Sequence, residues 1–401
     1  MNHINLIVIF LLILFAGTII YLATDYFGPK NIGLRPDNKF GLDCLRARDL
    51  VVQEFDKNGN LWATRGLLIY CLRNGDVKFK KAFHLNTGFS HFWFNNFTFV
   101  RKYMLRAECI EMTISDNGSI CAFTSGAMWN KTENEKKFRK TFILPNYGIS
   151  VGRGIMSTGL SFLSGEDFVF GEYFSNSQKT AIKIYRYLDY LKEWNAIYEF
   201  PPGQIRHIHS LQKDPYTGRF WVCTGDEDQE PMIGWSDDEF KSVNPIGRGS
   251  QKWRACQLVF TEDAVYWGAD TGSEEHGGIY KWDKKTEIVK QLQRFPGAIF
   301  YGTRLSTGHI IMSTDRESFP NERDDKTRFL IIDESDNIRE IEGGSWNYQK
   351  KGIRFNFAKL RLQRTQGNHL LAVSCLNLKE IPDGDLLIFD EYIFNKISSR
   401  K

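Results

Sequence analysis

The polar residues of this chain that are best suited to chemistry lie between residues 204 and 271. His207 and His209 are two positions apart, so on a β-strand both imidazoles project from the same face. Because histidine gains and loses a proton near neutral pH, we predict that these two residues are a catalytic acid and base. Asp226 and Asp270 each follow an apolar run, and we predict that they contact the substrate.

Three arginines occupy related positions in successive parts of the chain, namely Arg206, Arg254 and Arg304. Guanidinium groups bind carboxylates well, so we predict that these arginines bind an anionic substrate. Neutralising the carboxylate of a uronic acid lowers the barrier to removing the neighbouring proton, which is how a polysaccharide lyase begins its reaction. Tyr301 lies three residues before Arg304 and completes the predicted catalytic set.

The same region contains residue types that can bind a metal ion. The candidate ligands are His207, His209, Asp226, Asp270 and His276. Two histidines on one strand face plus a carboxylate can hold zinc, and carboxylates also suit calcium. None of the spacings is diagnostic of a metal site. We therefore predict no metal and no cofactor, with calcium and zinc left open.

A repeated unit must position these residues. It consists of a turn rich in Asp, Asn and Gly, followed by an apolar strand that ends at a small or acidic residue. Seven units align: NLWATR (60–65), SICAFT (119–124), DFVFGE (167–172), RFWVCT (219–224), AVYWGAD (264–270), HIIMSTD (309–315) and HLLAVS (369–374). They begin at intervals of about 45–60 residues, and a period near 45 is typical of a β-propeller blade.

We therefore predict an all-β chain that forms a β-propeller of seven blades, with six or eight blades as alternatives. A β-sandwich or a β-helix is the competing architecture. Residues 42–55 would supply a strand that completes the last blade. The candidate site would lie at the central channel, where loops from neighbouring blades converge.

The composition fits this architecture. The chain has 401 residues, 14% aromatics, 34 Gly and only 11 Pro, as expected where tight turns join many strands. Its 52 basic and 48 acidic residues are mixed along the sequence, so we predict no nucleic-acid partner. We divide the chain into a membrane anchor or signal (1–24), a linker (25–39) and a propeller domain (40–395).

The N-terminal segment differs from the rest because residues 6–22 are apolar and uncharged. This length is close to the roughly 20 residues that cross a hydrocarbon core. A cleaved signal peptide and an uncleaved anchor both fit, but the first five residues contain no Lys or Arg, which favours the anchor. We predict one transmembrane helix at the N-terminus. The bulk of the chain would then be extracytoplasmic, in the periplasm or at the cell surface.

The segment HSLQKDPYTGRFWVCTGD (209–226) resembles the repeat of the sialidase-like, or BNR, propeller family. The piece IGWSDDEFKSV (233–243) is similar to the Asp-box of that family. Ser236 and Asp238 match the Asp-box, but Phe240 replaces its Gly and Val243 its Trp. The resemblance is best over residues 205–315 and extends to propellers found with bacterial polysaccharide machinery. It implies a propeller fold, whereas the F-R-I-P motif of hydrolytic sialidases is missing.

Our main functional prediction is a membrane-anchored, extracytoplasmic propeller that acts on or binds an acidic polysaccharide, with a lyase-like or glycosidase-like site. Its partners would be a carbohydrate and, through the N-terminal helix, the membrane. The first alternative is a non-enzymatic scaffold, or a carbohydrate- or protein-binding module, in a surface-polysaccharide or secretion apparatus. The second is a metal-dependent propeller similar to lactonases and strictosidine synthase, some of which also carry N-terminal anchors.

Overall fold

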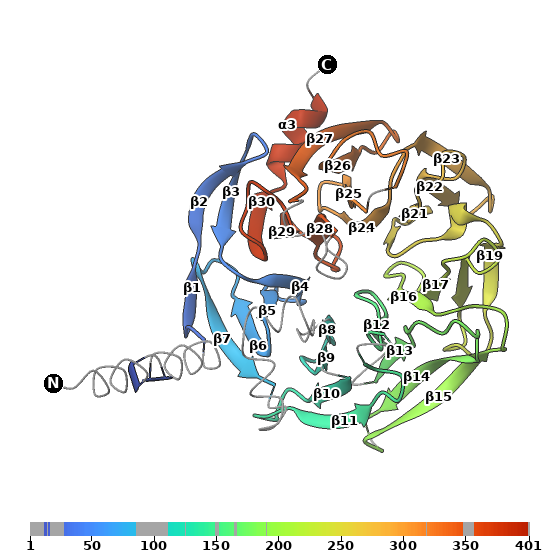
Figure 1. The fold of residues 1–401 in the computed structure, drawn as a ribbon, viewed down its shortest axis with the longest axis horizontal. Coiled ribbons are helices and arrows are strands. Elements are labelled where there is room, and N and C mark those ends of the chain that lie inside the picture. Colours follow the sequence, from blue (N-terminus) through green and yellow to red (C-terminus); the bar gives the residue numbers. More distant parts are fainter. Residues whose placement is uncertain are drawn as a thin grey trace, which may run out of the picture.

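The chain forms seven β-sheets arranged around a common axis, as Figure 1 shows in a view down that axis. This computed structural model describes residues 12–13, 15–16, 28–85, 111–124, 126–148, 152–163, 167–189, 191–317, 319–347 and 357–399. Consecutive strands within each sheet pair in an antiparallel manner, so each sheet is one blade of a propeller. The predicted all-β, seven-bladed architecture is confirmed.

The first three blades contain the following strands. Blade 1 consists of β4 (Val51–Phe55), β5 (Leu61–Arg65), β6 (Leu68–Leu72), β7 (Lys78–His84) and, at its outer edge, β1 (Asn31–Gly33). Blade 2 consists of β8 (Glu111–Ile114), β9 (Ile120–Thr124), β10 (Ala127–Lys131) and β11 (Arg139–Ile143). Blade 3 consists of β12 (Leu160–Phe162), β13 (Phe168–Gly171), β14 (Ile182–Leu188) and β15 (Glu193–Phe200).

The next three blades follow the same order. Blade 4 consists of β16 (Ile208–Lys213), β17 (Phe220–Thr224), β18 (Met232–Ser236) and β19 (Asn244–Arg248). Blade 5 consists of β20 (Leu258–Phe260), β21 (Ala264–Gly268), β22 (Gly278–Asp283) and β23 (Val289–Arg294). Blade 6 consists of β24 (Ile299–Arg304), β25 (Ile310–Thr314), β26 (Lys326–Ile332) and β27 (Ile338–Ser345).

Blade 7 closes the ring with strands from both ends of the chain. It consists of β28 (Lys359–Leu362), β29 (Leu370–Leu376), β30 (Asp385–Asp390), β3 (Leu42–Ala47) and β2 (Arg35–Lys39). Strand β3 pairs with β30, with Leu45 opposite Ile388. Residues 42–47 therefore complete the last blade as predicted, whereas residues 51–55 begin the first blade.

The segment 25–39 is not a plain linker. Its residues 31–33 form β1 on blade 1, and its residues 35–39 form β2 on blade 7. Polar and charged side chains in these strands hid them from a search for apolar runs, because an outermost strand faces solvent on much of its surface.

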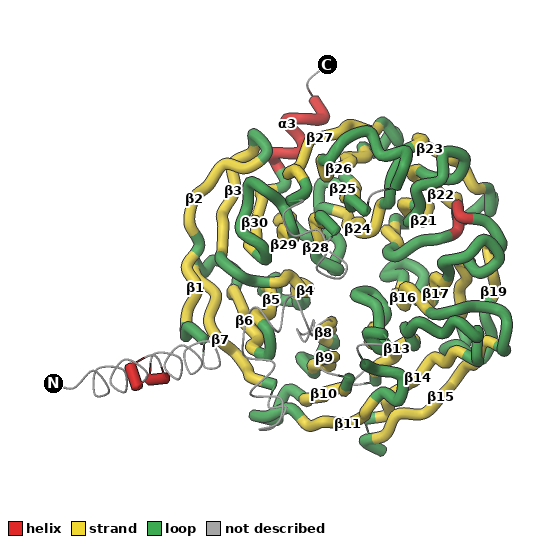
Figure 2. Tube along the Cα trace, in the orientation of Figure 1, coloured by secondary structure: helices red, strands yellow, loops and turns green. Residues whose placement is uncertain are grey.

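Helical structure is scarce in the ring, as Figure 2 shows. Its described helices are the short 3-10 helix η2 (Gln251–Trp253) and helix α3 (Tyr392–Ser399), which follows β30. The predicted N-terminal transmembrane helix falls on residues 1–24, which lie outside the described residues except for 12, 13, 15 and 16. In the portion of the chain that the structure describes, no helix is both long and apolar enough to span a bilayer.

Neighbouring blades pack through aromatic side chains and glycines. Trp221 of blade 4 lies against Trp282 of blade 5, with ring centroids 5.5 Å apart. Gly268, at the end of β21, lies so close to Ile299 of blade 6 that an added Cβ would be 2.2 Å from that side chain. The second strand of one blade thus fits directly against the inner strand of the next, and this contact fixes where the strand ends meet.

The Asp-box remnant forms the turn between β18 and β19. Asp238 accepts hydrogen bonds from the backbone and hydroxyl of Ser242, at 3.0 and 2.7 Å. Phe240 replaces the usual glycine and still adopts a positive φ of 66°, while its ring is fully buried and packs near Phe220. This motif is a turn of the scaffold, at the outer part of blade 4.

Candidate functional site

The candidate site lies at the end of the ring where the inner strand of each blade begins. There, the start of an inner strand is bonded to the end of the second strand of the preceding blade. The backbone N–H of Ile208 donates to the carbonyl of Glu172 at 2.9 Å, and that of Ile299 donates to Ala269 at 3.1 Å. Residues just before inner strands and just after second strands therefore meet at one end of the axis.

His207 and His209 reach this place from the start of β16. His207 immediately precedes the strand, and the pairing register shifts between Ile208 and Ser210, so His209 occupies a β-bulge. The two imidazoles stack with centroids 5.1 Å apart, on the same side of the chain as predicted. Both are buried, with 3% and 1% of their surfaces exposed.

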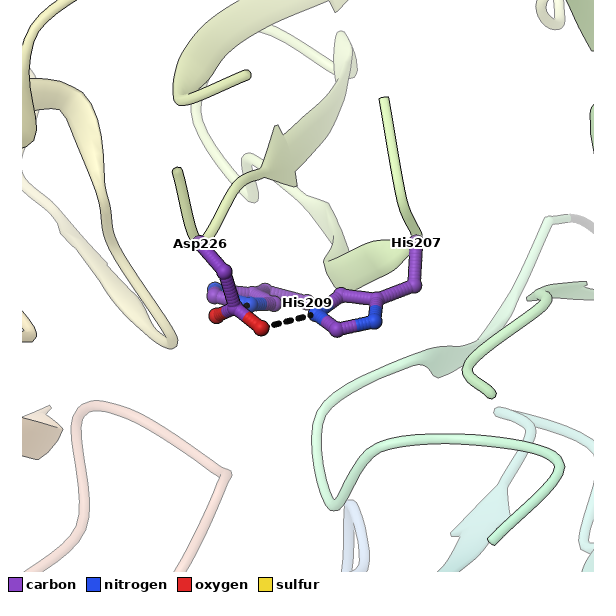
Figure 3. Close-up of side chains that lie close together, drawn as sticks. All are labelled: His207, His209 and Asp226. Atoms are coloured by element: carbon purple, nitrogen blue, oxygen red, sulfur yellow. Dashed lines mark ion pairs between the residues drawn. The ribbon is translucent and has the colours of Figure 1, made fainter. Parts of the chain in front are cut away.

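Both imidazoles are directed at one carboxylate, that of Asp226 just beyond β17 (Figure 3). The Nε2 atom of His207 lies 3.0 Å from Oδ2, and the Nε2 atom of His209 lies 3.3 Å from Oδ1. Burial alone would raise the pKa of Asp226, but its contacts with the two histidines outweigh burial and hold the pKa far below its usual value. Asp226 is therefore a carboxylate at neutral pH.

Arg254 connects this carboxylate to a second one in the next blade. Its Nη2 atom lies 3.0 Å from Oδ1 of Asp226, and its Nε atom lies 3.2 Å from Oδ2 of Asp270. Asp270 follows β21 as Asp226 follows β17, and it is fully buried. Burial raises the pKa of Asp270, and the positive charge of Arg254 opposes that shift.

The other ring nitrogen of each histidine faces a hydrogen-bond acceptor. Nδ1 of His207 lies 3.1 Å from the carbonyl oxygen of Phe174, and Nδ1 of His209 lies 3.7 Å from the sulfur of Cys256. Burial raises the pKa of Cys256 well above its usual value, so its thiol is protonated and donates to Asp270 at 3.4 Å. With Nδ1–H on a ring its Nε2 lone pair faces Asp226, whereas with Nε2–H the ring donates to Asp226, which is the contact that lowers the pKa of Asp226.

Two residues that the sequence did not single out complete the surroundings. The ring of Tyr173 packs on that of His207 with centroids 4.1 Å apart, and burial raises its pKa to about 12. Arg153 is half-buried and close enough to lower the pKa of Tyr173 by its charge. Tyr173 follows β13 at the position that Asp226 and Asp270 occupy after β17 and β21, so the repeat marked its place, but a search for acidic residues passed over it. Arg153 follows no apolar run of the repeat, so the sequence offered no signal for it.

Tyr301 lies deeper along the axis than predicted for a residue that contacts substrate. It is in β24, is 7% exposed, and its hydroxyl is 3.3 Å from that of Ser157. The neighbouring Thr158 donates its hydroxyl to the carbonyl of His209 at 3.0 Å. Tyr301 therefore supports the histidines through the segment 157–158, and it has no direct contact with them among the described residues.

The three arginines do not form one cluster, which corrects that part of the prediction. Arg206 lies beside His207, but its guanidinium pairs with the exposed Glu227. Arg304 is the last residue of β24 and bonds to the hydroxyl of Tyr216 at 2.8 Å. Because β24 begins at the end of the axis where the site lies, Arg304 lies at the opposite end. The sequence comparison placed Arg304 level with Arg206 and Arg254, but Arg304 lies one strand length further along the axis.

A second charged cluster continues around the axis into blades 6 and 7. Lys359, the first residue of β28, pairs with Asp315 at 2.6 Å and lies 3.9 Å from Glu317. The charge of Glu317 raises the pKa of Asp270, and the charge of Asp226 raises the pKa of Glu317, which links the two clusters. Asp315 is fully buried near the axis, and the side chain of Glu317 is 11% exposed.

Two groups of side chains could hold a metal ion within the described residues. One consists of His207, His209 and Asp226, and the other of His209, Cys256 and Asp270; the ligand atoms of each lie within 4.8 Å of one another. His276 belongs to neither group. Its backbone N–H donates to Ser273 in the turn before β22, and its ring faces the exposed Glu275.

Comparison with known proteins supports the fold and does not assign a family. No family model matches the chain, and no curated protein matches its sequence. Several solved structures are similar at low sequence identity. "Oligogalacturonate lyase in complex with manganese" has a TM-score of 0.55 and 10% identity over 91% of this chain and 99% of that one.

Two further structures illustrate the breadth of the similarity. YCF48 from Cyanidioschyzon merolae has a TM-score of 0.51 and 12% identity, covering 86% of this chain and 96% of that one. The extracellular domain of a one-component system, BT4673, from B. thetaiotaomicron has a TM-score of 0.49 and 12% identity. That match covers 88% of this chain, which spans only 39% of the other. At these identities, the two likenesses with TM-scores above 0.5 support a propeller fold and establish nothing about activity.

Proposed function

We propose that this protein acts on an acidic polysaccharide at the end of the axis occupied by His207, His209 and Asp226. The observation that carries the proposal is the convergence of two buried imidazoles on one ionised carboxylate. A structural role alone would require one polar partner per buried ring, whereas here two rings, a guanidinium and a carboxylate meet at one point. We refer to His207, His209 and Asp226 as the histidine centre.

The proposed reaction is β-elimination at a uronic acid residue. The histidine centre would accept the proton beside the substrate carboxylate, since histidine and carboxylate groups are the usual proton carriers of such sites. Tyr173 would donate a proton to the departing glycosidic oxygen. Its raised pKa of about 12 keeps that proton on the hydroxyl until the transition state.

Cations at the rim of the centre would bind the acidic substrate. Arg153 is half-buried and has no ion pair among the described residues, so it can receive a substrate carboxylate. Arg206 is 24% exposed, and its partner Glu227 lies at the surface, where substrate could replace it. Arg254 is held by two carboxylates and is assigned an electrostatic role beside the centre.

An oligogalacturonate lyase with a similar fold supports the choice of an acidic sugar polymer, although that likeness alone assigns no activity. We also propose an extracytoplasmic location, because residues 6–22 are uncharged and long enough for an anchor. The alternative is a non-enzymatic carbohydrate-binding propeller. The burial of both histidines favours it, because Asp226, with 26% of its side chain exposed, is the member of the centre that a polymer can reach directly.

The experiment is an elimination assay with the purified full chain. Polygalacturonate, alginate and hyaluronan are each incubated with the protein, and ultraviolet absorbance reports unsaturated uronate ends. We expect Asp226→Asn to lower turnover by about 100-fold or more. Asp237→Asn, an exposed aspartate in the same blade, is the matched control and should leave turnover unchanged.

Three outcomes separate the hypotheses. Unsaturated product that depends on Asp226 supports the lyase. Retention of the polymers without product supports the binding module. Neither product nor retention with any acidic polymer would refute the proposed function.

A further inference from the structure

We infer that the histidine centre binds a divalent transition-metal ion through Nε2 of His207, Nε2 of His209 and the carboxylate of Asp226. The ion would be a cofactor of the centre. Its binding follows from the ligand geometry itself, and only its part in a reaction rests on the proposed function.

The donor set suits such an ion. Two imidazole nitrogens with one carboxylate form a ligand set that zinc and neighbouring divalent metals accept. Ligand atoms at about 2.0–2.2 Å from a common ion lie roughly 3–4 Å from one another. The His207–Asp226 and His209–Asp226 distances of 3.0 and 3.3 Å fall in that range, so small adjustments of side chains would complete the site.

The second ring nitrogens are arranged as metal-bound histidines require. Histidine ligands almost always donate their other N–H to a carbonyl, a carboxylate or a water molecule, which fixes the ring and raises its basicity. His207 has the carbonyl of Phe174 for this purpose, and His209 has the sulfur of Cys256. Cys256 in turn donates to Asp270, so the chain of contacts orients both rings.

Nδ1 of each ring can donate to its own neighbour, which turns the Nε2 lone pairs toward Asp226. In that arrangement the lone pair of His207 Nε2 faces the carboxylate at 3.0 Å in a buried place, and a cation between them removes the repulsion. The Nε2 atom of His207 has no hydrogen-bond partner of suitable geometry among the described residues. A metal ion satisfies both imidazoles and the carboxylate at once, whereas a proton satisfies only one imidazole.

Arg254 is compatible with the ion because it contacts Asp226 through Oδ1 and leaves Oδ2 facing His207. Its charge is balanced by Asp270 on its other side. Asp226 therefore keeps one negative charge for the ion. Only three protein groups bind the ion, which leaves a position for water or a substrate oxygen, as in catalytic metal sites. In the proposed reaction, an oxygen at that position would accept the substrate proton in place of the imidazoles, whose Nε2 atoms would bind the ion.

The test is direct metal binding to the full chain. The protein is stripped with a chelator and titrated with zinc alone, and with cobalt(II) alone for its visible absorption spectrum. We expect one ion per chain and a cobalt spectrum of imidazole coordination. His207→Ala and His209→Ala should each lower zinc affinity by more than about 100-fold, and Cys256→Ala by about 10–100-fold.

His276→Ala is the matched control, because this histidine lies outside the centre and should leave affinity unchanged. Circular dichroism verifies that each variant is folded. If a histidine variant does not fold, the cobalt spectrum of the wild type decides the question. No cobalt or zinc bound by the wild type, or a tight ion retained by the His207→Ala/His209→Ala protein, overturns the inference.

The two proposals fail in different ways. A bound ion without product from any polymer would leave the metal site standing and reject the lyase. Product formation by the chelator-treated, metal-free protein would leave the lyase standing and reject the metal. Loss of zinc on Cys256→Ala with retention in His207→Ala would place the ion among His209, Cys256 and Asp270, which also contradicts the assigned site.

Discussion

Lys359 and Asp315 form an ion pair across the boundary between blades 7 and 6, with 2.6 Å between Nζ and Oδ2. Asp315 is fully buried, and burial raises its pKa to about 7, which the charge of Lys359 opposes. The ammonium group also lies 3.9 Å from the centre of the Phe300 ring. Two blades are thus joined near the axis by a charge contact in addition to apolar packing.

Replacing Lys359 with Met should leave the Asp315 carboxylate without its partner. Above the raised pKa of Asp315, we expect the free energy of unfolding to fall by about 3–5 kcal/mol, since one charge of a buried pair is left unbalanced. Chemical denaturation of the full chain measures this change. The double variant Lys359→Met/Asp315→Leu should recover most of it, and equal losses in the single and double variants would contradict the prediction.

Gly268→Ala tests the contact between blades 5 and 6. The added Cβ would lie 2.2 Å from the Ile299 side chain and 3.1 Å from its carbonyl oxygen, so the inner strand must shift. Overpacking of this kind costs about 1–3 kcal/mol. Gly33→Ala is the control, because a Cβ there meets nothing within 4 Å, and thermal unfolding of both variants gives the comparison. Equal melting temperatures would show that the inner strand of blade 6 shifts at no measurable cost in stability.

The stability of the protein should depend on pH through Glu54 in β4. Burial raises its pKa from 4.5 to about 7, with Glu111 adding to the shift and Arg364 opposing it. Because the folded state holds this proton more tightly than the unfolded state, the stabilisation is complete below about pH 4.5 and is lost as the pH rises to about 7. Arg361 and Arg364 both pair with Glu111 beside it.

Glu54→Gln should remove this dependence. The amide oxygen can still accept from the Ile114 backbone, and no charge develops at high pH. At about 1.4 kcal/mol per pKa unit, the variant should gain on the order of 3–4 kcal/mol over wild type above pH 7. Denaturation at several pH values measures the slope, with the exposed Glu262→Gln as control. An unchanged slope in Glu54→Gln would assign the dependence to other groups.

Tyr173→Phe and Tyr301→Phe separate a proton donor from a structural tyrosine. Loss of the Tyr173 hydroxyl should lower turnover of the polysaccharide by about 100-fold, with the stability nearly unchanged. Loss of the Tyr301 hydroxyl should remove its bond to Ser157, lower stability by about 1 kcal/mol and change turnover by only a few-fold. Steady-state kinetics and unfolding of both variants provide the data. The reverse pattern would make Tyr301 the proton donor.

The sequence predicts the architecture well because the same turn–strand pattern recurs in every blade. Each turn–strand unit carries the same apolar pattern, and the acidic residue at its end places Asp226, Asp270 and Asp315 near the axis. The same reasoning misplaced Arg304, since a repeat gives its period but not which end of a strand reaches the site. The six residues of β24 separate the end of the ring where the site lies from the end where Arg304 lies.

Other features of the site depend on contacts between distant segments. Tyr173 approaches His207 from the preceding blade, and Cys256 approaches His209 from the following blade. No local pattern encodes either approach, because both follow from the angle between blades. The β-bulge at His209 is also hidden from a sequence reading, which assumes a regular alternation of faces.

The pairing of β3 with β30 has a consequence for biosynthesis. Leu45 leaves the ribosome 343 residues before Ile388, so β2 and β3 wait for their partner while the six intervening blades are synthesised. During this time the nascent chain carries an unpaired strand edge, which is a target for chaperones and for misassembly between chains. The emergence of β30, and not the folding of any single blade, sets the earliest moment at which the ring can close.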